Sequence, residues 1–454
     1  MALTDKLTAI ANAIREKTGG TELLTLDQMP TEIAGIETGG GGASVAEKDV
    51  NFIDYDGTVL YAYTVEEAQA LTELPALPER EGLICQGWNW SLEDIKAHNR
   101  AVNVGAMYIT DDGKTRIYIS LQEGRTSPML GVCPNGTVTV DWGDGTEPDV
   151  LTGTSLTTAK WTPTHNYASA GDYVISLTVD GEMGLCGSSG TNAQSAILRH
   201  SSTADSRNNV YQNAVRKIAI GRGVTAIYGY AFSACGGLTS IVIPNSVTNI
   251  GGYVFQNCAN LTSVVIPNGI TIIDISEFYA CHSLKSVVIP NSIASFSSNV
   301  FCECRSLSSV VIPDGVPNID GYAFQECRSL SSVVIPDGVT SIGSKAFQYC
   351  HALSSAIISD GVTSIGSTAF QYCRSLSSVV IPDGVTSIGS GAFDGCAGMK
   401  LYDFSKCTVV PTLSSANAFN SISADCEIRV PSTLYDEWIA ATNWSTYASK
   451  IVAV

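Results

Sequence analysis

Basic residues are scarce in this chain, in which 25 lysines and arginines stand against 43 aspartates and glutamates, for a formal net charge of −18. Because nucleic acids and anionic membranes attract proteins through basic surfaces, we expect neither as a partner. The sequence has no run of 18 apolar residues, so no membrane insertion is expected. The start Met1–Lys6 lacks a basic region followed by an apolar core, so we expect no signal peptide.

Catalytic signatures are missing as well. The five histidines are scattered, and the sequence has no phosphate-binding loop, no nucleophile elbow and no zinc-protease motif. A pair of glycosidase carboxylates would leave no spacing signature, and no such pair stands out. We therefore predict a protein without enzymatic activity, cofactor or metal.

What the chain does have is a repeat of 23 residues, marked by a phenylalanine and by a cysteine three residues later. The phenylalanines are Phe232, Phe255, Phe278, Phe301, Phe324, Phe347, Phe370 and Phe393. The cysteines are Cys235, Cys258, Cys281, Cys304, Cys327, Cys350, Cys373 and Cys396. A fixed period of this length predicts a solenoid of stacked units, which presents a long surface and no obvious catalytic cleft.

One unit, residues 330–350, shows what each repeat does. Val333 and Ile335 are two residues apart and so share one face of a strand. Pro336 ends that strand because proline lacks a ladder donor. Val339 and Ile342 then point inward from a short second segment, and the turn that holds Phe347 and Cys350 closes the unit. Three copies deviate, at Phe296, at Ser359 and at residues 275–277, which we interpret as local repacking.

These repeats resemble the BspA-type leucine-rich repeat of bacterial surface proteins, over residues 215–400. The positions of leucine, valine, isoleucine, proline, phenylalanine and cysteine all keep their register. The resemblance implies adhesion or binding to a host surface.

The eight cysteines in register are expected to stay reduced. Equivalent residues of stacked layers point in parallel with Cβ atoms about 4.8 Å apart, further than the roughly 3.5–4.5 Å of a disulfide. Cys302 lies two residues before Cys304 and faces the opposite way, so we expect Cys302 to be exposed. The remaining cysteines show no disulfide framework.

The N-terminal residues 1–38 predict a helical docking or oligomerisation segment, followed by a glycine-rich linker at 39–47. The stripe Leu3, Leu7, Ile10 and Ile14 fits one helix face. It is either a seam between copies, such as a homotrimer, or the inner face of a helical hairpin. Residues 7–20 resemble the starts of tail-associated proteins of phages of gut Firmicutes, which implies docking to other virion or tail proteins through residues 1–42.

Two β-rich modules follow. Residues 48–103 resemble the Listeria–Bacteroides repeat, a β-grasp-like module, and we expect a hairpin and a helix near 65–71 around a buried Trp88. Residues 104–186 resemble the polycystic-kidney-disease (PKD) type of immunoglobulin-like sandwich, through residues 142–146 and 165–173. Asp141, Asp144 and Asp149 could hold calcium, but turn chemistry explains them more simply.

Both ends of the solenoid need caps, because an end repeat otherwise exposes its apolar edge. We expect an irregular N-terminal cap at 187–214 and a C-terminal cap at 401–454. The second contains a strand at 426–430 and a helix at 434–442, and it resembles the cap common after BspA-type repeats. Trp438 and Trp444 are expected in the core of this cap.

A column of cations follows the repeat cysteines, with glutamates and tyrosines beside it. The candidate ligand-binding residues are Arg305, Arg328, Tyr349, His351, Tyr372 and Arg374. Stacked at the layer spacing, these side chains could bind acidic or neutral glycans. The alternative is a solvated edge with Arg–Glu pairs between turns. A second candidate surface is the row of outward serines and valines on the strands, which could pack against a partner.

These patterns together predict a mainly β, modular, non-enzymatic binding protein. The specific hypothesis is a phage tail-associated receptor-binding protein that recognises a bacterial or mucosal polysaccharide or a protein receptor. The alternatives are a bacterial cell-surface adhesin and a structural virion decoration protein. The expected location is accordingly the virion tail or an extracellular surface.

Overall fold

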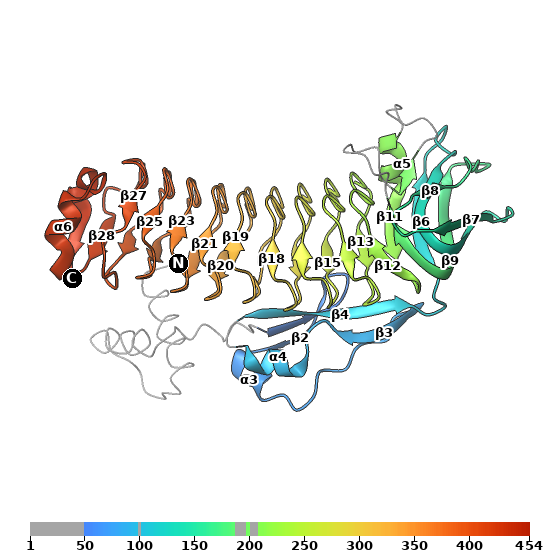
Figure 1. Cartoon of the computed structure of the whole chain (residues 1–454), viewed down its shortest axis with the longest axis horizontal. Coiled ribbons are helices and arrows are strands. Elements are labelled where there is room, and N and C mark those ends of the chain that lie inside the picture. The colour runs from blue at the N-terminus through green and yellow to red at the C-terminus, as the bar shows by residue number, and fades with distance from the viewer. Residues whose placement is uncertain (1–49, 99–100, 187–196, 200–207) are drawn as a thin grey trace, which may run out of the picture.

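The computed structural model describes residues 50–98, 101–186, 197–199 and 208–454. It is mainly β, and a long solenoid dominates it (Figure 1). The helical segment expected at 1–38 and the linker at 39–47 lie outside the described residues, as do Leu3, Leu7, Ile10 and Ile14.

One side of the solenoid is formed by the first strand of each repeat, except that residues 309–312 form no regular strand. These strands are β11 Val215–Ala219, β13 Ser240–Val242, β15 Ser263–Val265, β17 Ser286–Val288, β20 Ser332–Ile335, β22 Ser355–Ile358, β24 Ser378–Val380 and β26 Leu401–Asp403. Neighbours pair in parallel at the repeat register, so that Ser332 lies beside Ser355. The β-branched residues favour the strand, and in most repeats a proline directly follows its last isoleucine.

A second side is formed by shorter strands. They are β12 Val224–Ile227, β14 Asn249–Ile250, β16 Ile272–Ile273, β18 Ser295–Phe296, β19 Asn318–Ile319, β21 Ser341–Ile342, β23 Ser364–Ile365, β25 Ser387–Ile388 and β27 Thr412–Leu413. The last residue of each of these strands points inward, as the sequence predicted for Ile342, which is 1% exposed.

The third side is a turn whose backbone hydrogen bonds alternate. The N–H groups of Lys345, Phe347 and Tyr349 donate to carbonyls of the next layer at 2.7–3.0 Å. The N–H groups between them donate to the carbonyl three residues earlier within the same turn. This alternation places Lys345 and Tyr349 in the left-handed region, with φ of 59° and 62°. The turns from Phe232 to Phe393 repeat the pattern, so two columns of left-handed residues flank the phenylalanine column.

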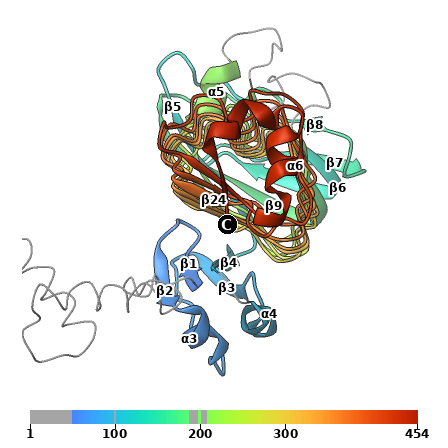
Figure 2. The same ribbon diagram turned by 90° about the vertical axis from the view of Figure 1, so that its left-hand side faces the viewer.

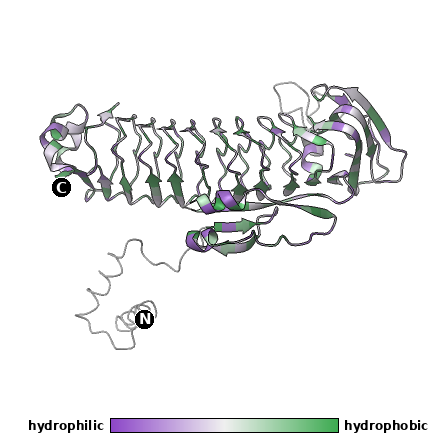
Figure 3. Cartoon of the chain, turned by 60° about the horizontal axis from the view of Figure 1, so that its bottom comes forward, coloured by the Kyte–Doolittle hydropathy of each residue, from purple (hydrophilic) through white to green (hydrophobic). Residues whose placement is uncertain are grey.

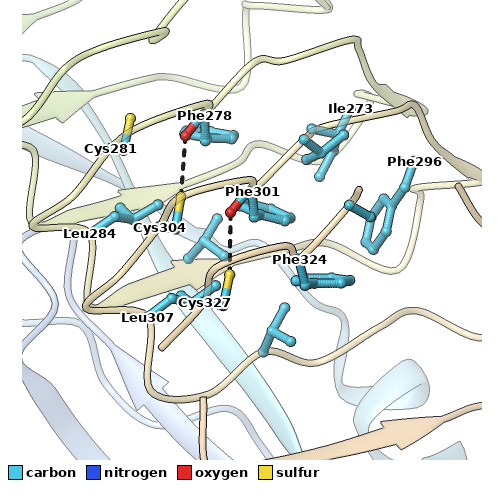
Figure 4. Close-up of a cluster of buried hydrophobic side chains, with 14 of the residues drawn as sticks. Ile273, Phe278, Cys281, Leu284, Phe296, Phe301, Cys304, Leu307, Phe324 and Cys327 are labelled. Carbon is cyan, nitrogen blue, oxygen red and sulfur yellow. Dashed lines mark hydrogen bonds between the residues drawn. The ribbon is translucent and has the colours of Figure 1, made fainter. Parts of the chain in front are cut away.

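The interior is a continuous stack of aromatic rings and thiols (Figure 4). Successive repeat phenylalanines stack with ring centroids 5.2–5.7 Å apart. Each of the seven repeat cysteines from Cys258 to Cys396 donates its thiol to the carbonyl oxygen of a phenylalanine of the preceding layer; the Cys304 Sγ lies 3.2 Å from the Phe278 oxygen. All fourteen cysteines are free thiols. The thiols thus act as small buried donors in a parallel ladder.

The expected exposure of Cys302 is wrong, because this residue is only 4% exposed. Its side chain lies in the column of Gln325 and its Sγ contacts the Gln325 amide oxygen at 3.5 Å. Residues two apart share a face in an extended strand, so the spacing gave no ground for exposure, and in this turn both Cys302 and Cys304 are buried.

The three deviating repeats repack as expected. Phe296 is buried and meets Phe301 edge-to-face at 6.2 Å. The Ser359 hydroxyl donates to the Ile335 carbonyl. Glu277 is buried where other repeats have alanine or valine, and its carboxyl accepts a hydrogen bond from the Asp274 backbone N–H at 3.2 Å.

The N-terminal end of the solenoid continues into an antiparallel sheet. Its strands are β5 Thr115–Leu121, β6 Met129–Asp141, β7 Asp149–Thr154, β8 Lys160–Trp161, β9 Gly171–Leu185 and β10 Leu198–Arg199. β5 pairs with β11 and β9 pairs with β12, so both strand sides of the solenoid extend into this sheet. The helix α5 Asn208–Ala214 precedes β11. The first layer is therefore covered by the sheet, and much of the cap expected at 187–214 lies outside the described residues.

The motif residues of this sheet serve its turns. The indole of Trp142 stacks on His165 at 4.4 Å, and His165 Nε2 lies 2.8 Å from Asp144 Oδ2. Asp141 and Asp144 accept hydrogen bonds from backbone N–H groups two residues later, and Asp149 accepts one from the Trp142 indole. These bonds are the turn chemistry that the sequence suggested. The PKD-type sandwich itself remains a prediction.

A separate small sheet lies against one side of the solenoid (Figures 1 and 2). Its strands are β1 Val50–Ile53, β2 Val59–Tyr63, β3 Leu83–Trp88 and β4 Val102–Thr110, in the order β2-β1-β4-β3, with helices α3 Val65–Gln69 and α4 Leu92–Ala97. We call residues 50–110 the module. The boundary expected at residue 103 falls inside β4, the central strand that holds this sheet together. The expected helix near 65–71 is present, and Trp88 is 7% exposed, which confirms its core role.

The C-terminal cap closes the other end. It contains β28 Glu427–Val430, η1 Ser432–Leu434, α6 Tyr435–Ala440, η2 Trp444–Lys450 and β29 Ile451–Ala453. Trp438 and Trp444 are fully buried and pack against Phe404, each at 5.3 Å. Their prediction as cap core is confirmed. The strand expected at 426–430 is not the last one, because β29 pairs beside it.

Candidate ligand-binding stripe

The six predicted site residues lie along one edge of the solenoid turn. Each layer contributes a left-handed residue and the residue two positions later. The layers pair Glu303 with Arg305, Glu326 with Arg328, Tyr349 with His351, and Tyr372 with Arg374. We call these eight residues the binding stripe. The interlayer hydrogen bonds of the turn hold its members in register, because the Tyr349 N–H donates to the Gln371 carbonyl in the next layer.

Half of the stripe is ionic. Arg305 contacts the Glu303 carboxylate at 2.6 Å, and Arg328 contacts Glu326 at the same distance. Both guanidinium groups remain exposed, at 44% and 49%. From the sequence, such Arg–Glu pairs were expected between neighbouring turns. In the structure each pair instead lies within a single turn. Exposed pairs of this kind contribute little stability, so these arginines stay available for a ligand.

The other half of the stripe is aromatic. The rings of Tyr349 and Tyr372 stack at 5.1 Å with an interplanar angle of 9°. His351 Nδ1 lies 3.0 Å from the Tyr372 carbonyl oxygen, and the Arg374 guanidinium lies 5.8 Å from the Tyr372 ring centroid. The ring of Tyr372 also covers the backbone of Gly395, where a Cβ would come within 2.4 Å of it.

This packing decides what the stripe can offer. The Tyr372 ring is sandwiched between Tyr349 and Gly395, so its faces are occupied and its hydroxyl edge is left for a ligand. The stripe is thus a row of hydroxyl and guanidinium donors, with the glutamate carboxylates as acceptors. Such a row suits the hydroxyl and carboxylate groups of an extended glycan.

Sequence reasoning missed the second column of left-handed residues. Tyr230 and Tyr253 stack at 4.7 Å with parallel rings. Further along, the Lys345 ammonium lies 4.9 Å above the ring of Tyr322. The same period of 23 residues marks these positions in the sequence, so the pattern could have revealed them.

A glutamine ladder runs beside the phenylalanine column and was missed as well. The Gln325 amide donates to Gln348 at 2.6 Å, Gln348 donates to Gln371, and Gln371 donates to Asp394 at 2.8 Å. These bonds tie four layers together just behind the binding stripe. They favour a rigid turn edge, which limits the entropy that a ligand would have to overcome.

The module lies along the strand side of the solenoid (Figure 3). It covers part of the outward serine and valine row, since Val265 and Val288 are buried in a cluster with Ile53 and Met107. Asn89 Nδ2 donates to the Ile266 carbonyl at 3.1 Å and Trp90 Nε1 donates to the Ile289 carbonyl at 3.2 Å. In the parallel ladder these carbonyls would accept N–H groups from positions 290 and 313, and both are prolines. The module therefore satisfies acceptors that the proline at each strand end leaves without a ladder partner.

Glycine allows the close contact in this interface. A Cβ at Gly105 would lie 2.4 Å from Val265 Cγ1 and 3.1 Å from Val288 Cγ1, so β4 rests directly on these side chains. Ile53 and Met107 pack in the same cluster. The module and the solenoid thus bury a shared apolar surface.

Two further observations concern the described residues only. Among them, no group of three or more His, Cys, Asp and Glu side chains could hold a metal ion. Within the same ranges, no helix is long and apolar enough to cross a membrane.

Comparison with known proteins identifies the repeats. Residues 206–328 and 294–423 match the family model described as BspA type leucine rich repeat region, in six copies. This match supports the leucine-rich-repeat interpretation of residues 215–400. No curated protein matches the chain.

Three solved structures are similar in part. A leucine rich cell surface protein from Faecalibacterium prausnitzii is 27% identical, with 48% of this chain and 73% of that chain covered and a TM-score of 0.29. A leucine-rich repeat protein from Eubacterium ventriosum is 20% identical, with 56% and 75% covered and a TM-score of 0.35. The pneumococcal vaccine antigen PcpA is 14% identical, with 51% and 76% covered and a TM-score of 0.26.

Proposed function

We propose that this chain is a non-enzymatic adhesion protein, which recognises a bacterial or mucosal surface glycan through the binding stripe. The observation that carries the proposal is the array of exposed arginine and half-buried tyrosine side chains, repeated at the layer spacing along a rigid edge. A polysaccharide presents its own groups at regular intervals, so a periodic edge can engage several sugars at once.

The match to the BspA type repeat region supports the setting of a bacterial cell surface. We therefore favour the surface adhesin over the phage tail protein. The tail setting, like that of a virion decoration protein, depends on docking through residues 1–42, which lie outside the described residues. Both remain predictions of the sequence.

The test is binding of the fluorescently labelled full-length protein to a panel of gut Firmicutes and their isolated surface polysaccharides. We expect saturable binding to a subset of strains, competed by one polysaccharide. Replacing Arg328, Tyr349 and Arg374 together by alanine should abolish it.

The matched control is Arg429→Ala. Arg429 pairs with Glu427 two residues earlier at 3.2 Å and is 44% exposed, so it has the chemistry of the stripe arginines at a place outside the stripe. Its removal should leave binding unchanged. Unaltered binding by the triple variant would refute the role of the stripe, and absence of binding to every strain would refute adhesion.

A further inference from the structure

The outward row of valines and isoleucines on the first strands is covered at one end and open at the other. Val242, Val265 and Val288 are at most 5% exposed, because the module lies on them. In the last repeats, by contrast, Ile357 is 56% exposed and Val380 is 48% exposed. The same row of apolar side chains that the module covers in the early repeats is therefore exposed to solvent in the last repeats.

A change of charge accompanies this change of cover. The position two residues after the last isoleucine of the strand holds asparagine in three repeats under or next to the module, Asn245, Asn268 and Asn291. From there on it holds exposed aspartates, Asp314, Asp337, Asp360 and Asp383. We call these four residues the aspartate row. Layers stack about 4.8 Å apart, so the row concentrates negative charge beside the open strip.

One side chain of the module contacts the aspartate row. His98 Nδ1 lies 3.6 Å from the Asp314 carboxylate, at the first member of the row. The existing interface thus combines apolar contact on the valine row with a histidine imidazole beside the first aspartate of the row. In the repeats after Asp314, the module covers neither the apolar row nor the aspartates beside it, so both can contact another partner.

We propose that the open strip, formed by Val334, Ile357 and Val380 with Asp337 and Asp360 beside it, binds an amphipathic helix of a partner protein that carries lysine or arginine along one flank. Side chains three and four residues apart on a helix face repeat about every 4.5–6 Å along its axis, which brackets the layer spacing of about 4.8 Å. Apolar side chains of the helix would pack on the valine row while its basic flank meets the aspartates.

The proposed site is separate from the binding stripe, since it lies on the strand side of the solenoid and the stripe lies on the turn. A second copy of the chain fits this surface poorly. The chain carries a net charge of −18, and a copy would bring acidic groups toward the aspartate row. The charge therefore selects a basic partner.

The experiment measures fluorescence anisotropy of a labelled helical peptide with the full-length protein. The peptide has leucine at helical spacing on one face and lysine along one flank, and a matched peptide has glutamate on that flank. We expect saturable binding of the lysine peptide, weakened at least about tenfold by Ile357→Ser with Val380→Ser, because the variant removes two apolar contacts.

Two further variants separate the contributions. Asp337→Asn with Asp360→Asn restores the residue type of the covered repeats, and it should weaken binding and reduce its dependence on salt. Ile272→Ser alters an isoleucine of similar exposure, 49%, on the second strand side and should change nothing. Sedimentation of each variant accompanies the binding curves.

Three results would overturn the proposal. The first is a lysine peptide that does not bind, or binds the serine variant equally well. The second is equal binding of the glutamate peptide. The third is a dimer of the unmodified protein that Ile357→Ser with Val380→Ser dissociates, which would assign the surface to a second copy. None of these results depends on glycan binding, so the adhesion proposal stands or falls separately.

Discussion

The indole of Trp90 donates a hydrogen bond to the carbonyl oxygen of Ile289, 199 residues further along the chain. This bond and its neighbour from Asn89 join the module to the solenoid at two successive layers. Both acceptors lack a ladder partner because the next layer offers proline at that position. The interface therefore joins apolar surfaces and also fixes which layers of the solenoid the module contacts.

Trp90→Phe should loosen the module without unfolding it. The variant keeps the ring but leaves the Ile289 carbonyl unsatisfied, which costs about 1–3 kcal/mol. We expect amide hydrogen exchange in β15 and β17, which the module covers, to accelerate roughly tenfold. The matched control is Trp88→Phe, whose indole bonds to Pro75 inside the module. Similar acceleration of β15 and β17 by both variants would contradict the interface role of Trp90.

Native thiol labelling should modify one cysteine. Cys85 is exposed and the other thirteen are buried. Burial raises the pKa of the Cys304 thiol well above its ordinary value, so the reactive thiolate is scarce as well as inaccessible. Mass spectrometry after maleimide treatment should show one adduct on the folded protein and fourteen in denaturant. Labelling of the repeat cysteines in the native protein would contradict the packed ladder.

Glu277 should make the protein less stable as pH rises. Burial raises the pKa of this carboxyl well above its ordinary value, so the folded protein keeps a proton that the unfolded chain releases above about pH 4.3. Stability from this group is complete at lower pH and falls by up to about 1.4 kcal/mol per pH unit above it. Glu277→Gln keeps the acceptor for the Asp274 N–H and removes this titration.

The difference in unfolding free energy between Glu277→Gln and the unmodified protein should therefore grow from about pH 4 to pH 7. Denaturant unfolding at several pH values measures it. A constant difference for the Glu277 variant would mean that the carboxyl is ionised in the folded state.

Thr368→Asn should stabilise the solenoid. Thr368 has φ of 54°, and a β-branched residue is strained in that region whereas asparagine tolerates it. We expect a gain of roughly 0.5–1 kcal/mol in unfolding free energy by denaturant titration. Thr363→Asn, at an exposed position outside the left-handed region, should give no gain. Equal effects of the two changes would point to the surface polarity of asparagine instead.

The repeat architecture was predictable because the same residue pattern recurs many times. The phenylalanines, the cysteines and the inward isoleucines each recur with the same period, so a correct prediction for one repeat applies to the others. The C-terminal cap was predictable for a related reason: Trp438 and Trp444 are large apolar residues at the end of a stack that must be closed.

The remaining features follow from contacts without a period. Nothing in the sequence distinguishes Gly105 from other glycines of the chain, yet it is the point where β4 meets Val265 and Val288. The burial of Cys302 depends on the turn between the left-handed residues Asn299 and Glu303, and the sequence period does not show which way a side chain in such a turn points. The same geometry places Glu326 and Arg328 on one turn, which is why their pair forms within the layer.

The single turn that joins the module to β5 has a mechanical consequence. β1 begins at Val50, in the module, and only the turn at residues 111–114 links the module to β5. A pull on Val50 would reach the solenoid by two routes, that covalent turn and the contacts of Asn89, Trp90 and Gly105 on its flank. The force would thus act on the flank of the solenoid rather than along its axis. The layers under the module would share the force with the terminal layer next to β5.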